Sequence, residues 1–314
     1  MYKHIETWDL WHYYLNAGSY LEAGTVTTEY PSLAILPMIL PRLITDNFGM
    51  YVLWYFALMA LCVGATSYFI HKAGKSIWWY LVIVLSLFPL IFGVYDLFVT
   101  LFFFFSVYLF SKKGIGHVTG SVSFLLSILL KLYPLSIIPL LLRYGRKSVF
   151  YVVAGLIAFG FLASDSTFIS FHKDRTAQPE SLYTNLLYVQ GKELETVYSH
   201  NAMALKDVHV PILFTLSFLA FGVIRAFRAK NIYAGSFYSV LGFILGNGVF
   251  SPQYLIWLAP FVPFIKRRTQ LLVMGASFLT MLYLGYYGQA VHFENPYYMI
   301  LFLRNVLLLL AIVV

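Results

Sequence analysis

The chain has 314 residues, of which 60% are hydrophobic, 19% are aromatic and only 11% are charged, and its formal net charge is +8. Soluble globular domains contain about 25% charged residues, so this composition argues against an ordinary soluble protein. The single cysteine, Cys62, excludes an intrachain disulfide framework and a cysteine-based metal site. We expect the positive charge to reflect basic cytoplasmic loops of a membrane protein rather than nucleic-acid binding.

Apolar runs recur along the whole chain. In chain order they lie at about 50–70, 77–92, 94–110, 118–130 with 134–142, 148–163, 210–227, 232–249, 254–265, 270–288 and 298–314. The runs are continuous rather than alternating, which favours helices over a barrel. The sequence therefore predicts an all-α polytopic membrane protein, a single integral domain over 1–314 with about 9–11 transmembrane helices.

The charges segregate between two sets of loops. Most of the 21 Lys and Arg residues, and none of the 13 Asp and Glu residues, lie in five loops between the apolar runs: HKAGK, SKKGIGH, RYGRK, RAFRAK and IKRR. Basic loops face the cytoplasm in membrane proteins. A single topology then places the carboxylates on the non-cytoplasmic side, among them Asp96 in the turn GVYD. We expect the loops 1–49 and 164–209 to cap an active site there.

Two apolar stretches contain prolines and are too short to span a membrane comfortably. The stretch ILLKLYPLSIIPLLLR, 128–143, holds Lys131 and two prolines, and PSLAILPMILPRLI, 31–44, holds three prolines. Backbone that leaves a helix at membrane depth must be buried in protein or line a wet cavity. We predict that both stretches are re-entrant or interfacial on the outer face; a membrane crossing by 31–44 is the alternative.

Carboxylates lie among aromatic residues in the first outer segment, 8–34. It contains Asp9 and Glu29 beside several Trp and Tyr residues. Flat aromatic faces next to acceptors for hydroxyl groups suit a sugar-binding cleft. An ordinary solvated loop with interfacial Trp and Tyr anchors is the alternative.

The second outer segment, FHKDRTAQPES at 171–181, gathers basic side chains. His172 and Arg175 lie within four residues of each other. A guanidinium binds phosphate in a bidentate manner, so this cluster suits a phosphate at a membrane surface. A simple solvated charge cluster is the alternative.

Three further polar side chains lie inside or beside apolar runs. Lys131 is a functional candidate because ionisable residues inside a membrane are costly, although snorkelling to the surface accounts for it equally well. Gln253 follows Pro252 at an expected outer boundary, and Arg304 lies inside the last apolar run. An Arg at that depth must be paired or reach water.

Six short patterns, taken in order, resemble those of a known family. EYPSLA, GVYD, LLKLYPLSIIPLLL, HKDRTAQPES, SPQYLIWLAPF and LRNVLLLL follow one another over most of the chain. This succession resembles the GT-C glycosyltransferases, in particular the polyprenyl-phosphate-mannose-dependent group (glycosyltransferase family 87), and more distantly the mannosyltransferases of GPI-anchor assembly. The resemblance implies a GT-C-like helical bundle in the cell membrane or the ER membrane. The family places a transmembrane helix before its catalytic acid, so we expect that helix to be missing here.

The resemblance also implies substrates and site residues. The donor is a polyprenyl-phosphate sugar, expected to be mannose, and the acceptor is a lipid-linked sugar or a glycan. DLWHY at 9–13 matches the family's D-x-x-x-Y setting, so Asp9 is the expected catalytic base of an inverting transfer, with Glu29 second. The residues expected to bind the substrate or the donor phosphate are Asp96, Lys131, Tyr133, His172, Arg175, Glu180, Ser181, Gln253 and Arg304. Related enzymes vary in metal dependence, so no cofactor is certain and a divalent cation stays open.

Two other classes of membrane protein suit the same residues. A polytopic transporter or lipid flippase also uses broken helices and buried charges, but often carries an inverted repeat, which is not evident in this sequence. A non-catalytic membrane scaffold is the third class, and it gives no reason for carboxylates to gather on one side.

Overall fold

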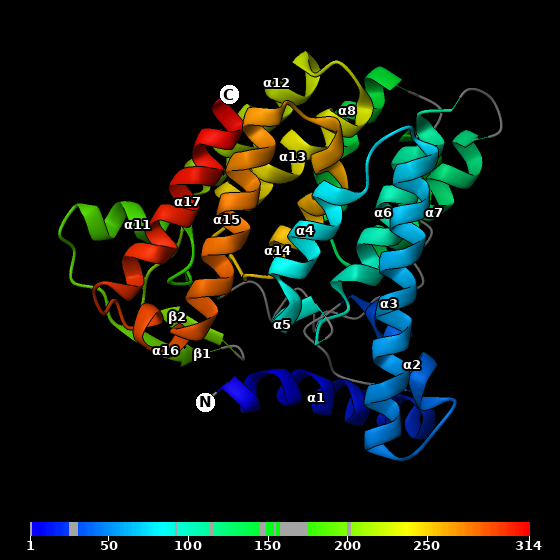
Figure 1. Ribbon diagram of the computed structural model, residues 1–314, viewed down its shortest axis with the longest axis horizontal. Coiled ribbons are helices and arrows are strands. Elements are labelled where there is room, and N and C mark those ends of the chain that lie inside the picture. Colours follow the sequence, from blue (N-terminus) through cyan, green and yellow to red (C-terminus); the bar gives the residue numbers. More distant parts are fainter. Residues whose placement is uncertain are drawn as a thin grey trace. The chain divides into compact units, whose positions relative to one another are not determined.

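The computed structural model describes residues 2–24, 31–91, 93–112, 116–144, 149–153, 155–157, 175–199 and 202–314. Within these ranges the chain is mostly helical and has one two-stranded sheet (Figure 1). The chain divides into two compact units. Unit 1 comprises Met1–Ile77 and Phe88–His172, and unit 2 comprises Trp78–Leu87 and Lys173–Val314.

Unit 1 contains the helices of the first half of the chain apart from α4. Its elements are α1 (Tyr2–Ala23), the 3-10 helix η1 (Ser32–Ile35), α2 (Leu36–Arg42), α3 (Phe48–Lys72), α5 (Phe88–Ile91), α6 (Asp96–Phe110), α7 (Gly116–Leu130), the 3-10 helix η2 (Tyr133–Ile137) and α8 (Ile138–Tyr144). α3 begins where the Asn47 side chain accepts a hydrogen bond from the Met50 amide at 3.1 Å, a typical N-cap. α6 and α7 lie side by side, and α6 also contacts α3.

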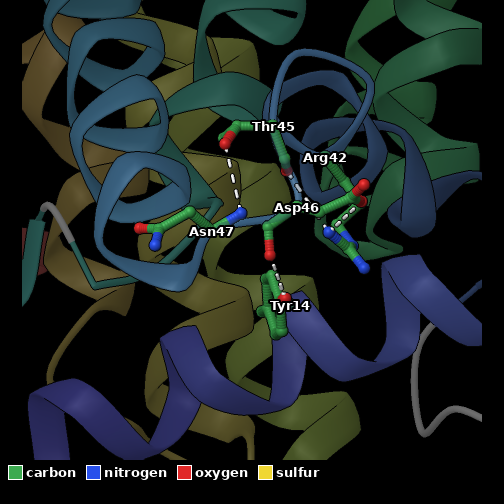
Figure 2. A network of polar contacts seen from close by, with 5 residues as sticks. All are labelled: Tyr14, Arg42, Thr45, Asp46 and Asn47. Carbon is green, nitrogen blue, oxygen red and sulfur yellow. Dashed lines mark hydrogen bonds and ion pairs between the residues drawn. The ribbon is translucent and has the colours of Figure 1, made fainter.

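A network of polar contacts holds α1 against the corner between α2 and α3 (Figure 2). Arg42 pairs with Asp46 and lies 4.4 Å from the centre of the Tyr14 ring of α1. The Tyr14 hydroxyl in turn donates to the Asp46 carbonyl oxygen at 2.5 Å, and the Asn47 amide donates to the Thr45 hydroxyl at 3.1 Å. Because this network fixes the middle of α1, it also sets the position of the residues one to two turns earlier, which include Asp9.

Unit 2 contains α4 and all elements of the second half. They are α4 (Trp78–Ser86), α11 (Leu182–Val189), β1 (Thr196–Ser199), β2 (Ala202–Leu205), α12 (Ile212–Arg228), α13 (Ile232–Gly246), α14 (Tyr254–Leu258), the 3-10 helix η3 (Ala259–Phe264), α15 (Arg267–Gly285), α16 (Tyr287–Val291) and α17 (Tyr297–Val313). The strands are antiparallel, with Thr196 opposite Leu205. α15 and α17 pack along each other, as do α12 and α13 (Figure 1).

Glycines allow α12 and α13 to approach each other at backbone distance. A Cβ atom on Gly222 would lie 2.8 Å from the Tyr238 carbonyl oxygen, and one on Gly242 would lie 2.6 Å from the Phe218 carbonyl oxygen. Both distances are too short for any side chain. The pair of helices therefore depends on the absence of side chains at these positions, as in close helix crossings elsewhere.

The prediction of a polytopic bundle of about 9–11 transmembrane helices is wrong. Among the described residues, one helix, α3, is long and apolar enough to cross a membrane. In its most apolar stretch of 18 residues, 22% of the residues are buried. Other apolar runs form shorter helices: α6, α7 and α13 have 15 residues each, and α17 has 17. A span needs about 20 residues.

Helix breaks explain why the apolar runs are longer than the helices. The run at 77–92 is divided into α4, which ends at Ser86, and the four-residue α5. The run at 254–265 is divided into α14 and η3, where Pro260 and Pro263 favour the tighter 3-10 turn. Hydropathy averaged over a run does not register these breaks.

The prediction that the two proline-rich stretches are re-entrant or interfacial was part of the polytopic bundle, and it is wrong with that bundle. Within 31–44, η1 is followed by the seven-residue α2, and within 128–143, η2 is followed by the seven-residue α8. η1 contacts α7, so the first stretch packs inside unit 1.

Candidate functional site

A buried ion pair joins the beginning of α6 to the end of α7 in unit 1. Lys131 Nζ lies 2.9 Å from Asp96 Oδ1 and 3.1 Å from Asp96 Oδ2. The Asp96 side chain is 1% exposed and that of Lys131 is 16% exposed. Asp96 is the first residue of α6, where a carboxylate also interacts favourably with the helix dipole. Lys131 therefore serves as the counter-ion of Asp96.

Two tyrosines, Tyr95 and Tyr133, lie near this ion pair. Lys131 Nζ lies 5.1 Å from the centre of the Tyr95 ring, a distance that allows a cation–π interaction. The buried Tyr133 hydroxyl lies 3.1 Å from Thr100 Oγ1 of α6. Tyr133 thus joins the KLYP segment to α6, and this contact brings it close to the ion pair.

Asp9 lies near the same group of aromatic residues. It is half-buried on α1, and Tyr13, one turn later on the same face, is buried. The Tyr13 ring lies 5.8 Å from the Tyr55 ring and 6.0 Å from the Tyr95 ring. Tyr95 in turn directly precedes Asp96 in the chain. Two carboxylates from distant parts of the sequence therefore converge near one tyrosine.

The Tyr55 hydroxyl is a buried polar group in this arrangement. Tyr55 is 0% exposed, and its hydroxyl oxygen has no hydrogen-bond partner among the described residues. Burying such a group without a partner costs about 1–3 kcal/mol. We call the whole group the acid–tyrosine cluster, and it consists of Asp9, Tyr13, Tyr55, Tyr95, Asp96 and Lys131.

A second polar cluster lies in unit 2, where α17 holds the segment that precedes α11. The Glu180 carbonyl oxygen accepts from Arg304 Nη2 at 2.6 Å and from Asn305 Nδ2 at 2.9 Å. Glu180 Oε1 accepts from the Tyr283 hydroxyl of α15 at 2.7 Å. Asn305 Nδ2 also donates to Asn185 Oδ1 at 2.5 Å. We call Glu180, Asn185, Tyr283, Arg304 and Asn305 the Glu180 cluster.

Burial dominates the electrostatics of the Glu180 cluster. It raises the pKa of Glu180, against the opposing effects of the Tyr283 hydrogen bond and the Arg304 charge. Burial likewise lowers the pKa of Arg304 to about 10. Glu180 Oε2 and Arg304 Nη1 are buried without a hydrogen-bond partner in the described part of the chain. Arg304 Cζ lies 4.0 Å from the centre of the Phe250 ring. This cation–π interaction partly compensates the cost of burying the guanidinium charge.

The other candidate residues of unit 2 lie outside these contacts. Ser181 caps α11, because its hydroxyl accepts from the Thr184 amide at 3.2 Å. Gln253, at the beginning of α14, accepts a hydrogen bond from the Ser251 hydroxyl. Arg175 is half-buried. The predicted roles of Ser181, Gln253 and Arg175 in substrate binding stay predictions.

The structure groups the candidates by unit. Asp9, Asp96, Lys131 and Tyr133 lie in unit 1, whereas Arg175, Glu180, Ser181, Gln253 and Arg304 lie in unit 2. Glu29 and His172 are outside the described residues. No group of three or more His, Cys, Asp or Glu side chains that could hold a metal ion occurs in the described ranges.

Sequence reasoning did not identify the tyrosines and the asparagine that complete the two clusters. Tyr55 follows Tyr51 by four residues on the buried face of α3, and that spacing was its only local signal. Tyr283 and Asn185 carried no signal, because their partners are more than a hundred residues away.

The fold and these contacts define a helical protein with a buried carboxylate–lysine pair among tyrosines. Comparison with protein-family models, with curated proteins and with solved structures found no match for this chain. The resemblance to the GT-C glycosyltransferases therefore stays a prediction from the sequence patterns.

Proposed function

We propose that this chain is a membrane-associated glycosyltransferase. It moves a sugar, expected to be mannose, from a polyprenyl-phosphate donor to a lipid-linked or glycan acceptor, with inversion at the anomeric carbon. The acid–tyrosine cluster is the proposed reaction centre, and Asp9 is its base.

One observation supports Asp9 over Asp96 in this role. Asp96 is 1% exposed and bonded to Lys131 through both carboxylate oxygens, whereas Asp9 is half-buried on the face of α1 that meets the tyrosines. A general base must reach the acceptor hydroxyl, so the more accessible carboxylate is the better candidate. Asp96 and Lys131 then act together as a fixed support beside it.

The proposed reaction is a direct displacement at the anomeric carbon. Asp9 takes the proton of the acceptor hydroxyl while the oxygen of that hydroxyl forms a bond to the anomeric carbon. The bond between that carbon and the donor phosphate oxygen breaks, and the phosphate leaves with the electron pair. Lys131 is the cation of the cluster, and its ammonium group would be shared between Asp96 and the leaving phosphate, where it stabilises the negative charge that develops.

The location of the cluster along α3 agrees with a membrane setting. Tyr51 and Tyr55 lie in the first turns of α3, whereas His71 and Lys72 end it. Basic residues favour the cytoplasmic side, so the cluster would lie toward the opposite face. Leu53 and Leu61 of α3 are 58% and 68% exposed, which provides an apolar surface for lipid.

Transfer of radiolabel tests the proposal. Membranes that contain the chain are incubated with radiolabelled polyprenyl-phosphate mannose, and lipid and glycan fractions are counted. We expect transfer by the wild-type chain and a loss of about 10²–10⁴-fold for Asp9→Asn, because the amide cannot accept the proton.

Glu22→Gln is the matched control. Glu22 is an exposed carboxylate further along the same helix, and its loss should leave transfer unchanged. Transfer by Asp9→Asn at nearly the wild-type rate would remove Asp9 as the base. No transfer by the wild-type chain to any acceptor would count against the whole proposal.

A further inference from the structure

A surface depression lies in unit 2, and no residue of the Glu180 cluster lines it. It has a volume of about 340 Å³, at the lower end of the range for small-molecule sites. Its walls come from α11, from the turn that follows α11, and from the segment that follows β2.

Backbone hydrogen bonds fix the rim of this depression. α11 ends at Val189. Two residues later Gly191 has a φ of 72°, in the left-handed region, and the Lys192 amide donates to the Leu187 carbonyl oxygen at 3.2 Å. On the other side, the Ala177 amide donates to the Val208 carbonyl at 2.7 Å. The depression is therefore bounded by ordered main chain on two sides.

The wall of the depression is apolar on one side. Tyr183, Leu187 and Leu194 contribute to it. The Tyr183 ring is held by an edge-to-face contact with Phe214 at 5.3 Å between ring centres. Since Tyr183 is only half-buried, part of this aromatic side chain remains available to a ligand.

Polar groups of both signs line the remainder. Glu193 and Asp207 provide carboxylates, and Lys192 and His209 provide basic groups. Asp207 has a φ of 54°, a conformation that Asp and Asn tolerate better than most residues. With histidine counted as neutral, the lining carries two carboxylates and one ammonium group, which disfavours an anion and suits an uncharged ligand whose hydroxyl groups donate to the carboxylates. A pyranose ring has this character, with an apolar C–H face and hydroxyls at its edge.

We propose that this depression binds a pyranose ring of a saccharide, as a docking site for a glycan acceptor. The choice of a sugar over other polyols rests on the proposed function. Tyr183 provides the surface against which the ring stacks, and Asp207 and Glu193 accept hydrogen bonds from its hydroxyls.

Saturation-transfer NMR of the full chain with a mannose disaccharide tests this site. The detergent must have no sugar head group, because glycosidic detergents would compete. We expect saturable binding by the wild-type chain, and binding about tenfold weaker for Tyr183→Ala. Asp207→Asn preserves the left-handed turn and removes the charge, and it should weaken binding about threefold to tenfold.

Tyr198→Ala is the control, since Tyr198 is 67% exposed on β1 and does not line the depression. Its binding should equal that of the wild type. The inference is overturned if the wild-type chain shows no saturable binding up to about 10 mM disaccharide, if Tyr183→Ala and Asp207→Asn both bind as the wild type does, or if inorganic phosphate binds in place of the saccharide.

The same assay separates this inference from the proposed function. Asp9→Asn should bind the disaccharide normally, because Asp9 lies in unit 1. Normal binding together with undiminished transfer by Asp9→Asn would reject the catalytic assignment and leave the saccharide site standing. Transfer by a wild-type chain that binds no disaccharide would reject the saccharide site and leave the proposed function standing.

Discussion

Lys131 and Asp96 depend on each other at the scale of single residues. Asp96 is almost completely buried, and a buried carboxylate is tolerated only when a cation or several hydrogen bonds compensate it. Lys131 supplies that cation with two contacts. Removing one member therefore differs in kind from removing both, because only the first change leaves an uncompensated charge.

Lys131→Ala should destabilise the protein by about 3–5 kcal/mol. The double variant Lys131→Met with Asp96→Leu should recover most of this loss, because it removes the charge that the single change leaves behind. Chemical denaturation of the purified protein measures both. The control is Lys206→Ala, which breaks an exposed pair with Glu195 and should cost far less stability, because water and salt screen exposed charges. Equal losses for Lys131→Ala and Lys206→Ala would contradict the argument.

Glu180 makes the stability of the protein depend on pH. Because its pKa is raised in the folded state by burial, the folded protein holds this proton more tightly than the unfolded chain does. The contribution of protonated Glu180 to the free energy of unfolding is fully present below the pKa of a Glu in the unfolded chain, about 4.3. It is lost as the pH rises through the pKa of Glu180 in the folded protein. Each unit by which the pKa is raised corresponds to about 1.4 kcal/mol.

Glu180→Gln should therefore remove this decline, because the amide does not ionise. Melting temperatures measured between pH 4 and pH 7 should fall for the wild type relative to the variant as the pH rises. Glu195→Gln, at a carboxylate that is 67% exposed, should follow the wild-type curve. Parallel curves for the wild type and Glu180→Gln would show that the Glu180 carboxyl does not contribute.

At the scale of elements, the approach of α12 to α13 is limited by main-chain atoms. Gly242→Ala would place a Cβ atom 2.6 Å from the Phe218 carbonyl oxygen. A carbonyl oxygen inside a helix cannot rotate away as a side chain can, so the helices must separate. We expect a loss of about 1–3 kcal/mol in the free energy of unfolding.

Gly64→Ala in α3 is the comparison for this prediction. No atom lies within 4 Å of a Cβ at position 64, so the substitution meets no obstacle and gains up to about 1 kcal/mol of helix propensity. Thermal unfolding of the two variants should move in opposite directions. Unfolding of Gly242→Ala at or above the wild-type temperature would show that the two helices can separate at no cost.

For the whole molecule, the apolar pattern predicted where helices lie better than how long they are. The run at 50–70 corresponds to α3, Phe48–Lys72, and the run at 232–249 corresponds to α13, Ile232–Gly246. The run at 77–92 divides into two short helices instead. Hydropathy measures how apolar a segment is, and a helix buried in protein can match a helix in lipid on that measure.

The sequence indicated Asp96, Lys131, Glu180 and Arg304 as candidate residues, but it did not indicate their pairings. Lys131 was identified because an ammonium in an apolar run is unusual, yet its partner Asp96 lies 35 residues away. Only the folded chain brings the end of α7 to the beginning of α6. The same holds for Arg304 and Glu180, which are 124 residues apart. Long-range pairs of this kind leave no periodic signal in a single sequence.

The hydrogen bonds from Arg304 and Asn305 to the carbonyl oxygen of residue 180 respond differently to mutation of the donor and of the acceptor residue. An acceptor that belongs to the peptide group is present whichever amino acid the codon at 180 specifies. The donors belong to side chains, so one codon change at 304 or 305 abolishes a bond. As sequences diverge, these two bonds would thus tolerate substitution at residue 180, whereas they constrain residues 304 and 305.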